Sequence, residues 1–299
     1  MIEQPVTVHG LVCHAHVEMA ITCFKSLLRF SIDPIQLVIH DDGSLTEEDQ
    51  DHLRHQLSGA TVISRTEADE LMHPLLQQYP TTRQFRQDVP HAVKLLDVSL
   101  LSEGDIAFCD SDILFLKPFA GLFQFPDAET SALFMQDYLE AYSIFPWHLL
   151  GAAKVRLPSK INSGLIFMSR KVYDLDFIEW FLSQREFRSK PLHKMEQTCW
   201  AAMGYRAGCR VWNPRQVVLM RPDTVLTDEM VAGHFVKEIR YRLQEFVMAT
   251  GHKIPDSKPS LVETICAEDC NILGLAENHF RRQSNRILSY RKKLIRIFN

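Results

Sequence analysis

The residues with the clearest chemical potential are Asp110 and Asp112, which flank Ser111 directly after the apolar run Ile106–Cys109. In open α/β sheets, ligands bind at the carboxyl ends of strands, so two carboxylates at such an end can face one ligand. Carboxylate oxygens suit hard divalent cations such as Mg²⁺ or Mn²⁺. A cation held there would bridge diphosphate oxygens and stabilise the charge on a leaving group. The triplet alone also fits a solvated turn, but the buried strand before it favours a site.

The elements that must position these carboxylates follow from the hydrophobic pattern. Short apolar runs predict strands, and three apolar stripes at helical spacing, in residues 17–27, 92–100 and 177–182, predict helices. Ser44 and Glu47 fit a capping box that opens a further helix. This alternation of strands and helices predicts an α/β fold with a mostly parallel sheet flanked by helices. The predicted strands are Val6–Val12, 37–39, Thr61–Ile63, Ile106–Cys109, 133–135, 165–168 and 217–220.

Composition bounds the class of protein. The 299 residues are 46% apolar and 23% charged, with a formal net charge of -4, which disfavours a nucleic-acid binder. Seven cysteines, an odd number, are scattered mostly through apolar segments, which indicates free thiols in a reducing compartment. The N-terminal residues predict no signal peptide, and no apolar run has the length of a membrane span. We therefore expect a cytoplasmic protein.

The chain is predicted to form one domain over residues 1–255, followed by a helical, basic C-terminal extension over residues 256–299. From about residue 277 the sequence interleaves basic and apolar residues. Such a helix either lies on an anionic membrane surface as a peripheral contact or packs on its own domain. The basic residues of this segment are Arg281, Arg282, Arg286, Arg291, Lys292, Lys293 and Arg296.

The order of short motifs resembles that of the GT-A fold glycosyltransferases with an Asp-x-Asp motif, especially the galactosyl- and glucosyltransferase branch. The resemblance spans about residues 6–237. It rests on Lys94 in the helix before the triplet, Asp110-Ser111-Asp112 itself, Asn162-Ser163-Gly164, Glu196-Gln197 and Gly233-His234. It implies a Rossmann-like GT-A fold and transfer of a sugar from a nucleotide-diphosphate donor, most commonly a UDP-sugar in that family. The acceptor would be a glycan, a lipid-linked molecule or a small molecule with a hydroxyl group.

The resemblance also implies roles for single residues. Asp110, Asp112 and His234 would hold Mn²⁺ or Mg²⁺, although His234 also fits a core histidine. Lys94 would contact the donor, where a lysine acts as a point charge toward phosphate; it also fits a solvated helix lysine. Ser111 would contact the nucleotide sugar between the two carboxylates.

The nucleotide would lie against two loops that follow strands. Cys13 and His14 follow the first strand at the start of a helix, where backbone N–H groups favour anionic or polar ligands. Asp41 and Asp42 end the second strand, where the resembling family reads the base or ribose. A turn that hydrogen-bonds its own backbone explains Asp41 and Asp42 equally simply.

The catalytic candidates are Glu196, Gln197 and Asn162. Glu196 would accept the proton of the acceptor hydroxyl or orient the donor sugar. The two amides would hydrogen-bond sugar hydroxyls or developing charge. Trp147, Trp200 and Trp212 are candidates for an aromatic face against a sugar, and each also fits the core. Arg83 and Arg86 lie in a polar stretch that predicts a surface loop, either a plain one or a lid over the donor.

Two other functions fit parts of the pattern. A haloacid-dehalogenase-like phosphatase also places an Asp-x-Asp after an apolar strand, but its triplet lies near the N-terminus and Thr or Val follows at the position of Leu114. A non-catalytic sugar-nucleotide-binding protein that kept the fold would carry the same residues without consuming a donor.

Overall fold

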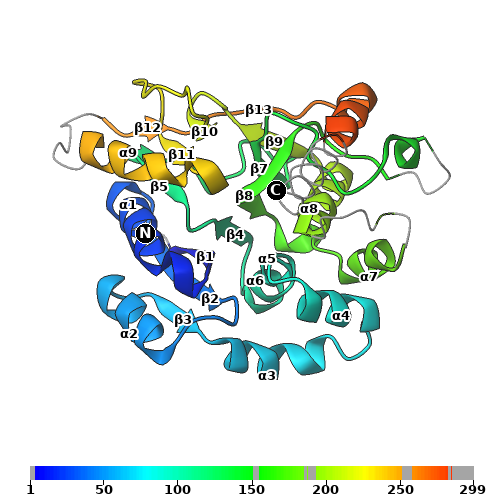
Figure 1. The fold of residues 1–299 in the computed structure, drawn as a ribbon, viewed down its shortest axis with the longest axis horizontal. Coiled ribbons are helices and arrows are strands. Elements are labelled where there is room, and N and C mark those ends of the chain that lie inside the picture. Colours follow the sequence, from blue (N-terminus) through cyan, green and yellow to red (C-terminus); the bar gives the residue numbers. More distant parts are fainter. Residues whose placement is uncertain are drawn as a thin grey trace, which may run out of the picture.

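The computed structural model describes residues 4–150, 155–184, 187, 193–250, 258–281 and 284. Its centre is an eight-stranded sheet whose strands follow one another from lower left to top in Figure 1. In spatial order they are β3 (Thr61–Ile63), β2 (Ile35–Asp41), β1 (Val6–Val12), β4 (Ile106–Cys109), β8 (Ile161–Met168), β7 (Ala132–Gln136), β9 (Cys209–Trp212) and β13 (Thr264–Cys266).

The sheet is mixed, as predicted. β1 pairs in parallel with β2 and β4, and β2 with β3, because helices connect these strands. β8 runs antiparallel between β4 and β7 and is buried along its whole length. The second half of β8 forms a continuous apolar run, which is why residues 165–168 were predicted as a strand, whereas Asn162, Ser163 and Gly164 interrupt that pattern in the first half.

Helices cover both faces of the sheet. Along β4, Ile106 and Phe108 join one core cluster, and Ala107 and Cys109 join the other. The first core is completed by α5 (Ala92–Leu95), α6 (Asp97–Leu101) and α8 (His193–Ala207), and the second by α1 (Val17–Phe30). Figure 1 shows α1 and these three helices on opposite sides of the strands. The other α-helices include α2 (Glu47–Gln56), α3 (Arg65–Leu75), α4 (Pro80–Asp88), α7 (Leu175–Ser183) and α9 (Leu243–Thr250).

A second, three-stranded sheet builds the rim of the site. It consists of β5 (Ile113–Phe115), β11 (Ala232–His234) and β10 (Val217–Leu219), with β11 between the other two. In the antiparallel register of β11 and β5, His234 lies opposite Ile113, the residue after Asp112. This pairing brings together two parts of the chain that are more than a hundred residues apart.

Three local predictions were wrong. The stripe over residues 92–100 forms the two short helices α5 and α6, which meet at Leu96, rather than one helix. The capping box of α2 is formed by Thr46 and Asp49 instead of Ser44 and Glu47, so the helix begins later. The stretch around Arg86 is helix α4, not a loop. Arg86 is buried and donates two hydrogen bonds to the carboxylate of Asp97, at 2.8 and 2.6 Å, so it serves packing instead of a lid.

Part of the C-terminal segment joins the main fold. β13 pairs with β9, and β12 (Ser260–Leu261) pairs with β6 (Phe119–Ala120). Residues 272–281 are helical, whereas most of the basic tail lies outside the described residues. The predicted boundary at residue 255 stays a prediction. Among the described residues, no helix combines the length and apolar character that crossing a membrane requires.

Candidate active site

The Asp-x-Asp triplet lies where the strand pattern placed it, at the carboxyl end of β4. Asp110 donates its backbone N–H to the carbonyl of Gly164 on β8 at 2.7 Å, and its own carbonyl accepts from Ile113 N at 3.2 Å. This turn sends the chain from β4 into β5 and carries both carboxylates at the switch between the two sheets. Asp112 is 4% exposed, and the side chain of Asp110 is 26% exposed, so ligands reach Asp110 more easily.

The carboxylates open into a cleft of about 410 Å³. Seven of the predicted site residues line it together, although they come from five separate stretches of chain. These are Lys94, Asp110, Asp112, Asn162, Glu196, Gln197 and His234, and the other lining residues are His91, Asp137, Leu139, Ala141, Ser163, Gly164, Lys194, Leu219, Val236, Lys237 and Arg240.

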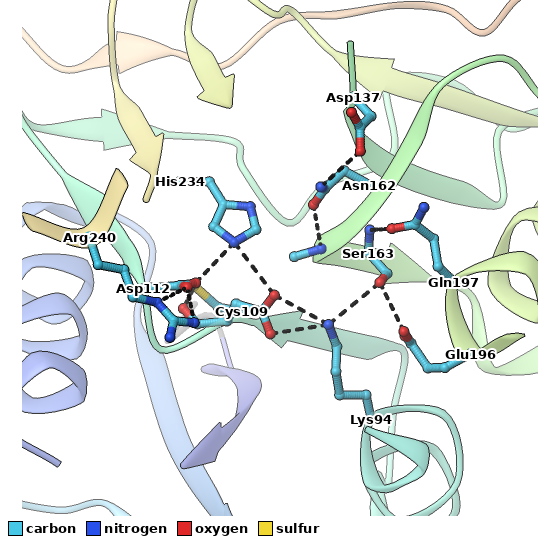
Figure 2. A network of polar contacts seen from close by, with 12 residues as sticks. Lys94, Cys109, Asp112, Asp137, Asn162, Ser163, Glu196, Gln197, His234 and Arg240 are labelled. Atoms are coloured by element: carbon cyan, nitrogen blue, oxygen red, sulfur yellow. Dashed lines mark hydrogen bonds and ion pairs between the residues drawn. The ribbon is translucent and has the colours of Figure 1, made fainter. Parts of the chain in front are cut away.

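Asp110, Asp112 and His234 form a compact cluster of potential metal ligands. One ligand atom from each lies within 4.8 Å of the others, and no other group of this kind is found in the described part of the chain. His234 Nε2 is 2.9 Å from Asp112 Oδ1 (Figure 2). The same nitrogen is 3.6 Å from Asp110 Oδ2. Two carboxylates and one imidazole nitrogen in a buried pocket are a donor set that fits Mn²⁺ or Mg²⁺.

The cluster is strongly polarised. Burial alone would raise the pKa of Asp112, but the charges and hydrogen bonds of His234 and Arg240 outweigh it and lower the pKa to about 2. Burial alone would lower the pKa of His234, but the carboxylates of Asp112 and Asp110 outweigh it and raise the pKa. His234 Nδ1 is buried without a hydrogen-bond partner among the described residues, so Nε2 is the nitrogen committed to the carboxylates.

Gly164 explains how His234 comes so close. A Cβ atom at this position would lie 2.3 Å from His234 Cε1 and 2.8 Å from Asn162 Oδ1. Both contacts are far below van der Waals distance, so any side chain at this position would push the imidazole away from the carboxylates. The glycine of the Asn-Ser-Gly motif is therefore required by the close approach of β8 to His234.

Lys94 is a buried cation at the floor of the cleft. Its Nζ lies 3.1 Å from Asp110 Oδ1. It also donates to Ser163 Oγ at 3.5 Å (Figure 2). Burial opposes its charge, yet the carboxylates of Asp110 and Glu196 dominate and raise its pKa. Lys94 is 3% exposed, so it is not the solvated helix lysine that the sequence also allowed.

Glu196 and Gln197 enter the cleft from the first turns of α8. Ser163 Oγ donates to Glu196 Oε2 at 3.1 Å, and Ser163 N donates to Gln197 Oε1 at 3.3 Å. Burial, aided by Asp110 and opposed by Lys94, raises the pKa of Glu196 to about 7. A carboxyl group with this pKa changes charge near neutral pH, which is the property that general acid–base catalysis needs.

Asn162 and Asp137 form the opposite wall. Asn162 Oδ1 accepts from Gly164 N at 2.8 Å, and Asn162 Nδ2 donates to Asp137 Oδ2 at 3.5 Å. Burial raises the pKa of Asp137, against the backbone N–H donors of Leu139 and Tyr138. Sequence reasoning missed Asp137, although it directly follows β7 and so shows the same strand-end signal as Asp110.

Arg240 is the second residue that sequence reasoning missed. It belongs to the 3-10 helix η5 (Lys237–Arg242) after β11, and its Nε and Nη2 donate to Asp112 Oδ2 at 3.0 and 2.7 Å. Its Nη1 lies 3.0 Å from His16 Nε2, in the loop after β1. Nothing in its local pattern distinguishes Arg240 from other surface arginines, because only the tertiary fold brings η5 to Asp112.

The remaining predicted residues do not line this cleft. His14 lies against α2, where its Nδ1 is 2.6 Å from Asp49 Oδ2. Cys13 Sγ is 3.1 Å from His16 Nδ1, one step from Arg240. Ser111 is half-buried in the turn. Asp41 Oδ1 accepts from Gly43 N at 2.7 Å and Leu45 N at 3.0 Å, and Asp42 Oδ1 accepts from Ser44 N at 3.0 Å.

The three tryptophans that were candidates for an aromatic face differ in exposure. Trp200 and Trp212 are 0% exposed and belong to the two core clusters, whereas Trp147 is 60% exposed. Trp147 stacks on Phe145 at 4.6 Å between ring centroids. Trp147 is not one of the described residues that line the cleft.

Comparison with known proteins places this geometry in a wider context. No protein-family model and no curated protein matches the sequence. Solved structures do match in fold. The galactosyltransferase LgtC, solved with donor and acceptor sugar analogs, superposes with a TM-score of 0.54 at 11% identity over 84% of this chain and 98% of that one.

Two further matches agree. Mouse xyloside xylosyltransferase 1 gives a TM-score of 0.53 at 12% identity, covering 77% of this chain and 97% of its own. The bifunctional glycosyltransferase WbbM gives 0.52 at 10% identity, covering 85% of this chain and 50% of its own. The chain therefore has the fold of the GT-A glycosyltransferases, with its Asp-x-Asp carboxylates at the carboxyl end of β4.

Proposed function

We propose that this protein is a metal-dependent glycosyltransferase that moves a sugar from a nucleotide-diphosphate donor to a hydroxyl group. The observation that carries the proposal is the convergence of Asp110, Asp112 and His234 in one cleft with Glu196. The fold supports it, because the solved structures of this fold named above are glycosyltransferases. Fold alone does not fix function, so the proposal depends on the residues of the cleft.

Asp110, Asp112 and His234 would hold the cation, Mn²⁺ or Mg²⁺. Bound there, a divalent cation supplies Lewis-acid stabilisation of the charge that develops on a leaving diphosphate. Lys94 adds a fixed positive charge beside Asp110 and keeps that carboxylate oriented. Because Lys94 is buried and held on both sides, it provides this field without reorganising during the reaction.

Glu196 would act as the general base for the acceptor hydroxyl. With a pKa of about 7, its carboxylate form can accept the proton of an acceptor hydroxyl within hydrogen-bond reach. Ser163 donates to Oε2 and thereby fixes the orientation of the carboxylate. If the acceptor instead binds elsewhere in the cleft, the same geometry lets Glu196 orient the donor sugar.

The amides of Asn162 and Gln197 would position sugar hydroxyls. Gln197 is fixed at both ends, because Oε1 accepts from Ser163 N and Nε2 donates to Ala141 O at 3.1 Å. Asn162 and Asp137 present an amide and a carboxylate from the opposite wall. A pocket with polar groups on two walls can hold a pyranose ring by its hydroxyls.

The identity of the donor and the location of the protein in the cell are further proposals. We propose a UDP-sugar as donor, with its nucleotide near Cys13, His14, Asp42 and Ser111. The backbone N–H of Asp42 donates to the carbonyl of Val12, the last residue of β1, at 3.2 Å, so Asp42 lies beside the loop after β1. We also propose a cytoplasmic location, with peripheral membrane contact through the basic C-terminal residues.

The proposal is tested by thermal shift of the full chain with UDP, GDP, CDP and ADP, each with and without Mn²⁺. A ligand that binds only the folded state raises the Tm, because at a hundred times its Kd it stabilises that state by about 2.7 kcal/mol. We expect a shift with UDP that grows with Mn²⁺ and is lost in Asp112→Asn. No shift with any nucleotide would contradict the proposal. A phosphate-ester hydrolysis assay would then test the phosphatase alternative.

A further inference from the structure

Arg240 hydrogen-bonds to the carboxylate of Asp112, one of the three potential metal ligands. It donates two hydrogen bonds to Asp112 Oδ2, at 3.0 and 2.7 Å, while His234 Nε2 lies 2.9 Å from Asp112 Oδ1. Both oxygens of Asp112 therefore have partners from the protein itself (Figure 2). In this arrangement the Arg240 guanidinium supplies the positive charge that balances Asp112.

A guanidinium and a divalent cation compete for the charge of this carboxylate. Both carry positive charge, and in a site where Asp112 is only 4% exposed their repulsion is weakly screened. A cation bound to Asp112 therefore weakens the contact of Arg240 with Oδ2 and favours its displacement. The side chain of Arg240 is 35% exposed and leads toward His16 in the loop after β1, so it has room to move.

Displacement leaves a guanidinium at the mouth of the cleft without its carboxylate. An arginine in this position is stabilised by an anion that it can bind through two parallel N–H donors, and the oxygens of a diphosphate offer that geometry. An incoming diphosphate thus compensates for the contact that the metal removes from Arg240.

We propose that Arg240 couples metal binding to diphosphate binding: it competes for Asp112 when the cleft holds no diphosphate and releases Asp112 when a diphosphate arrives. This inference rests on the proposed function and adds that the chain itself opposes metal binding in the absence of donor. By thermodynamic linkage, the metal and the nucleotide diphosphate must then raise each other's affinity through Arg240.

The test measures the Kd of Mn²⁺ by titration calorimetry on the full chain, with and without UDP, for wild type, Arg240→Gln and Lys237→Gln. Lys237 is the matched control, because it lines the same cleft from the same 3-10 helix. Without UDP, we expect R240Q to bind Mn²⁺ about tenfold more tightly than wild type, the equivalent of one charge-assisted hydrogen bond. K237Q removes a positive charge from the same cleft, so it measures the general effect of charge, and it should change the Mn²⁺ Kd much less than R240Q does.

With UDP present, the difference between R240Q and wild type should shrink, because UDP already draws Arg240 away from Asp112 in the wild type. Arg240→Lys keeps the charge without the fork, and its Mn²⁺ Kd without UDP should stay within about threefold of wild type. If R240Q lowers the Tm, the effect of UDP on the Mn²⁺ Kd of R240K decides the question, and a coupling between UDP and Mn²⁺ as large as in wild type would overturn the role of the two parallel donors of Arg240. Equal Mn²⁺ affinity of R240Q and wild type without UDP would overturn the role of Arg240 alone. Absence of Mn²⁺ binding in every variant, with and without UDP, would instead overturn the proposed metal-dependent function.

Discussion

Two pairs of carboxylates stand at strand ends in this protein, and they have opposite surroundings. Asp110 and Asp112, after β4, face charged side chains from distant elements: Lys94 on α5 and Arg240 on η5. Asp41, at the end of β2, accepts hydrogen bonds from backbone N–H groups, including that of Arg65 at 3.3 Å. The first pair gathers charge in a cleft, whereas the second holds the turn after β2 and, through Asp41, the start of α3 by backbone hydrogen bonds.

The difference shows that a carboxylate at a strand end is a weak signal by itself. Position relative to the sheet does not separate the two pairs, because both follow parallel strands beside β1. What separates them is the chain that follows: Asp112 leads into β5, which pairs with β11, whereas Asp42 leads into a turn before α2. Long-range pairing therefore decides which carboxylates meet cations.

The largest effect should come from Asp112→Asn. The amide removes the charge that holds His234 and Arg240 and that would bind the cation, so we expect donor turnover to fall by about 10²–10³-fold. Turnover per folded molecule is measured with Mn²⁺ present, and circular dichroism establishes the folded fraction. If D112N keeps more than a third of wild-type turnover, the contrast between the two carboxylate pairs has no catalytic meaning.

Gly164→Ala should weaken the site without touching a ligand. The added Cβ would lie 2.3 Å from His234 Cε1 and must displace the imidazole, so we expect Mn²⁺ affinity to fall about tenfold. Gly104→Ala is the matched control, because a Cβ there meets no atom within 4 Å. Titration calorimetry with Mn²⁺ and UDP distinguishes the two variants. Equal affinities in G164A and G104A would mean that His234 is not a ligand.

Asp41→Asn should cost stability instead of chemistry. Asp41 is 5% exposed, and its two oxygens accept three backbone hydrogen bonds, which an amide cannot fully replace. We expect the free energy of unfolding to fall by about 1–3 kcal/mol, with turnover per folded molecule within about threefold of wild type. Urea unfolding measures the first quantity. A large loss of turnover in a variant of wild-type stability would place Asp41 in the nucleotide site.

The last effect concerns stability alone, in a buried pair with no role in the cleft. His9 Nδ1 lies 2.9 Å from His40 Nε2, and burial lowers their pKa values to about 4 and about 3. Both therefore stay neutral in the folded protein at pH values where the unfolded chain, with histidine pKa values near 6.5, takes up protons. Stability must then fall as pH drops from about 6.5 toward 4, by up to about 1.4 kcal/mol per pH unit for each histidine.

His9→Gln tests this effect. The variant removes one of the two protons that unfolding takes up, so urea unfolding between pH 7 and pH 5 should show a shallower loss of stability than in wild type. Donor binding above pH 6.5 should not change. An unaltered pH dependence in H9Q would mean that the acid sensitivity comes from the carboxylates.

Much of the fold was predictable because its strands form short apolar runs between polar turns. β1, β3 and β4 have the predicted bounds, and the predicted strand over residues 165–168 forms the second half of β8. What the pattern missed is local: Leu96 breaks one amphipathic stripe into two helices, and Thr46 outcompetes Ser44 as the cap of α2. Both depend on small differences in turn geometry that hydrophobic periodicity does not carry.

The cleft was predictable through its motifs and incomplete without the fold. Seven of the predicted site residues line one cleft, because the strands and the helices α5 and α8 that carry them meet there. Arg240 and Asp137 were missed for different reasons: Asp137 carries a strand-end signal that was overlooked, whereas Arg240 reaches Asp112 only through the pairing of β11 with β5. No local pattern encodes that second kind of contact.

The central claim is tested most directly by measuring nucleotide release from a panel of UDP-sugars with the purified full chain, with Mn²⁺ and with EDTA. The account predicts that at least one donor is consumed with Mn²⁺, that EDTA stops its consumption, and that D112N does the same. Consumption that persists in EDTA and in D112N would contradict the mechanism. Tight binding of UDP and Mn²⁺ without consumption of any donor, with or without added sugar acceptors, would identify a binding protein that kept the fold.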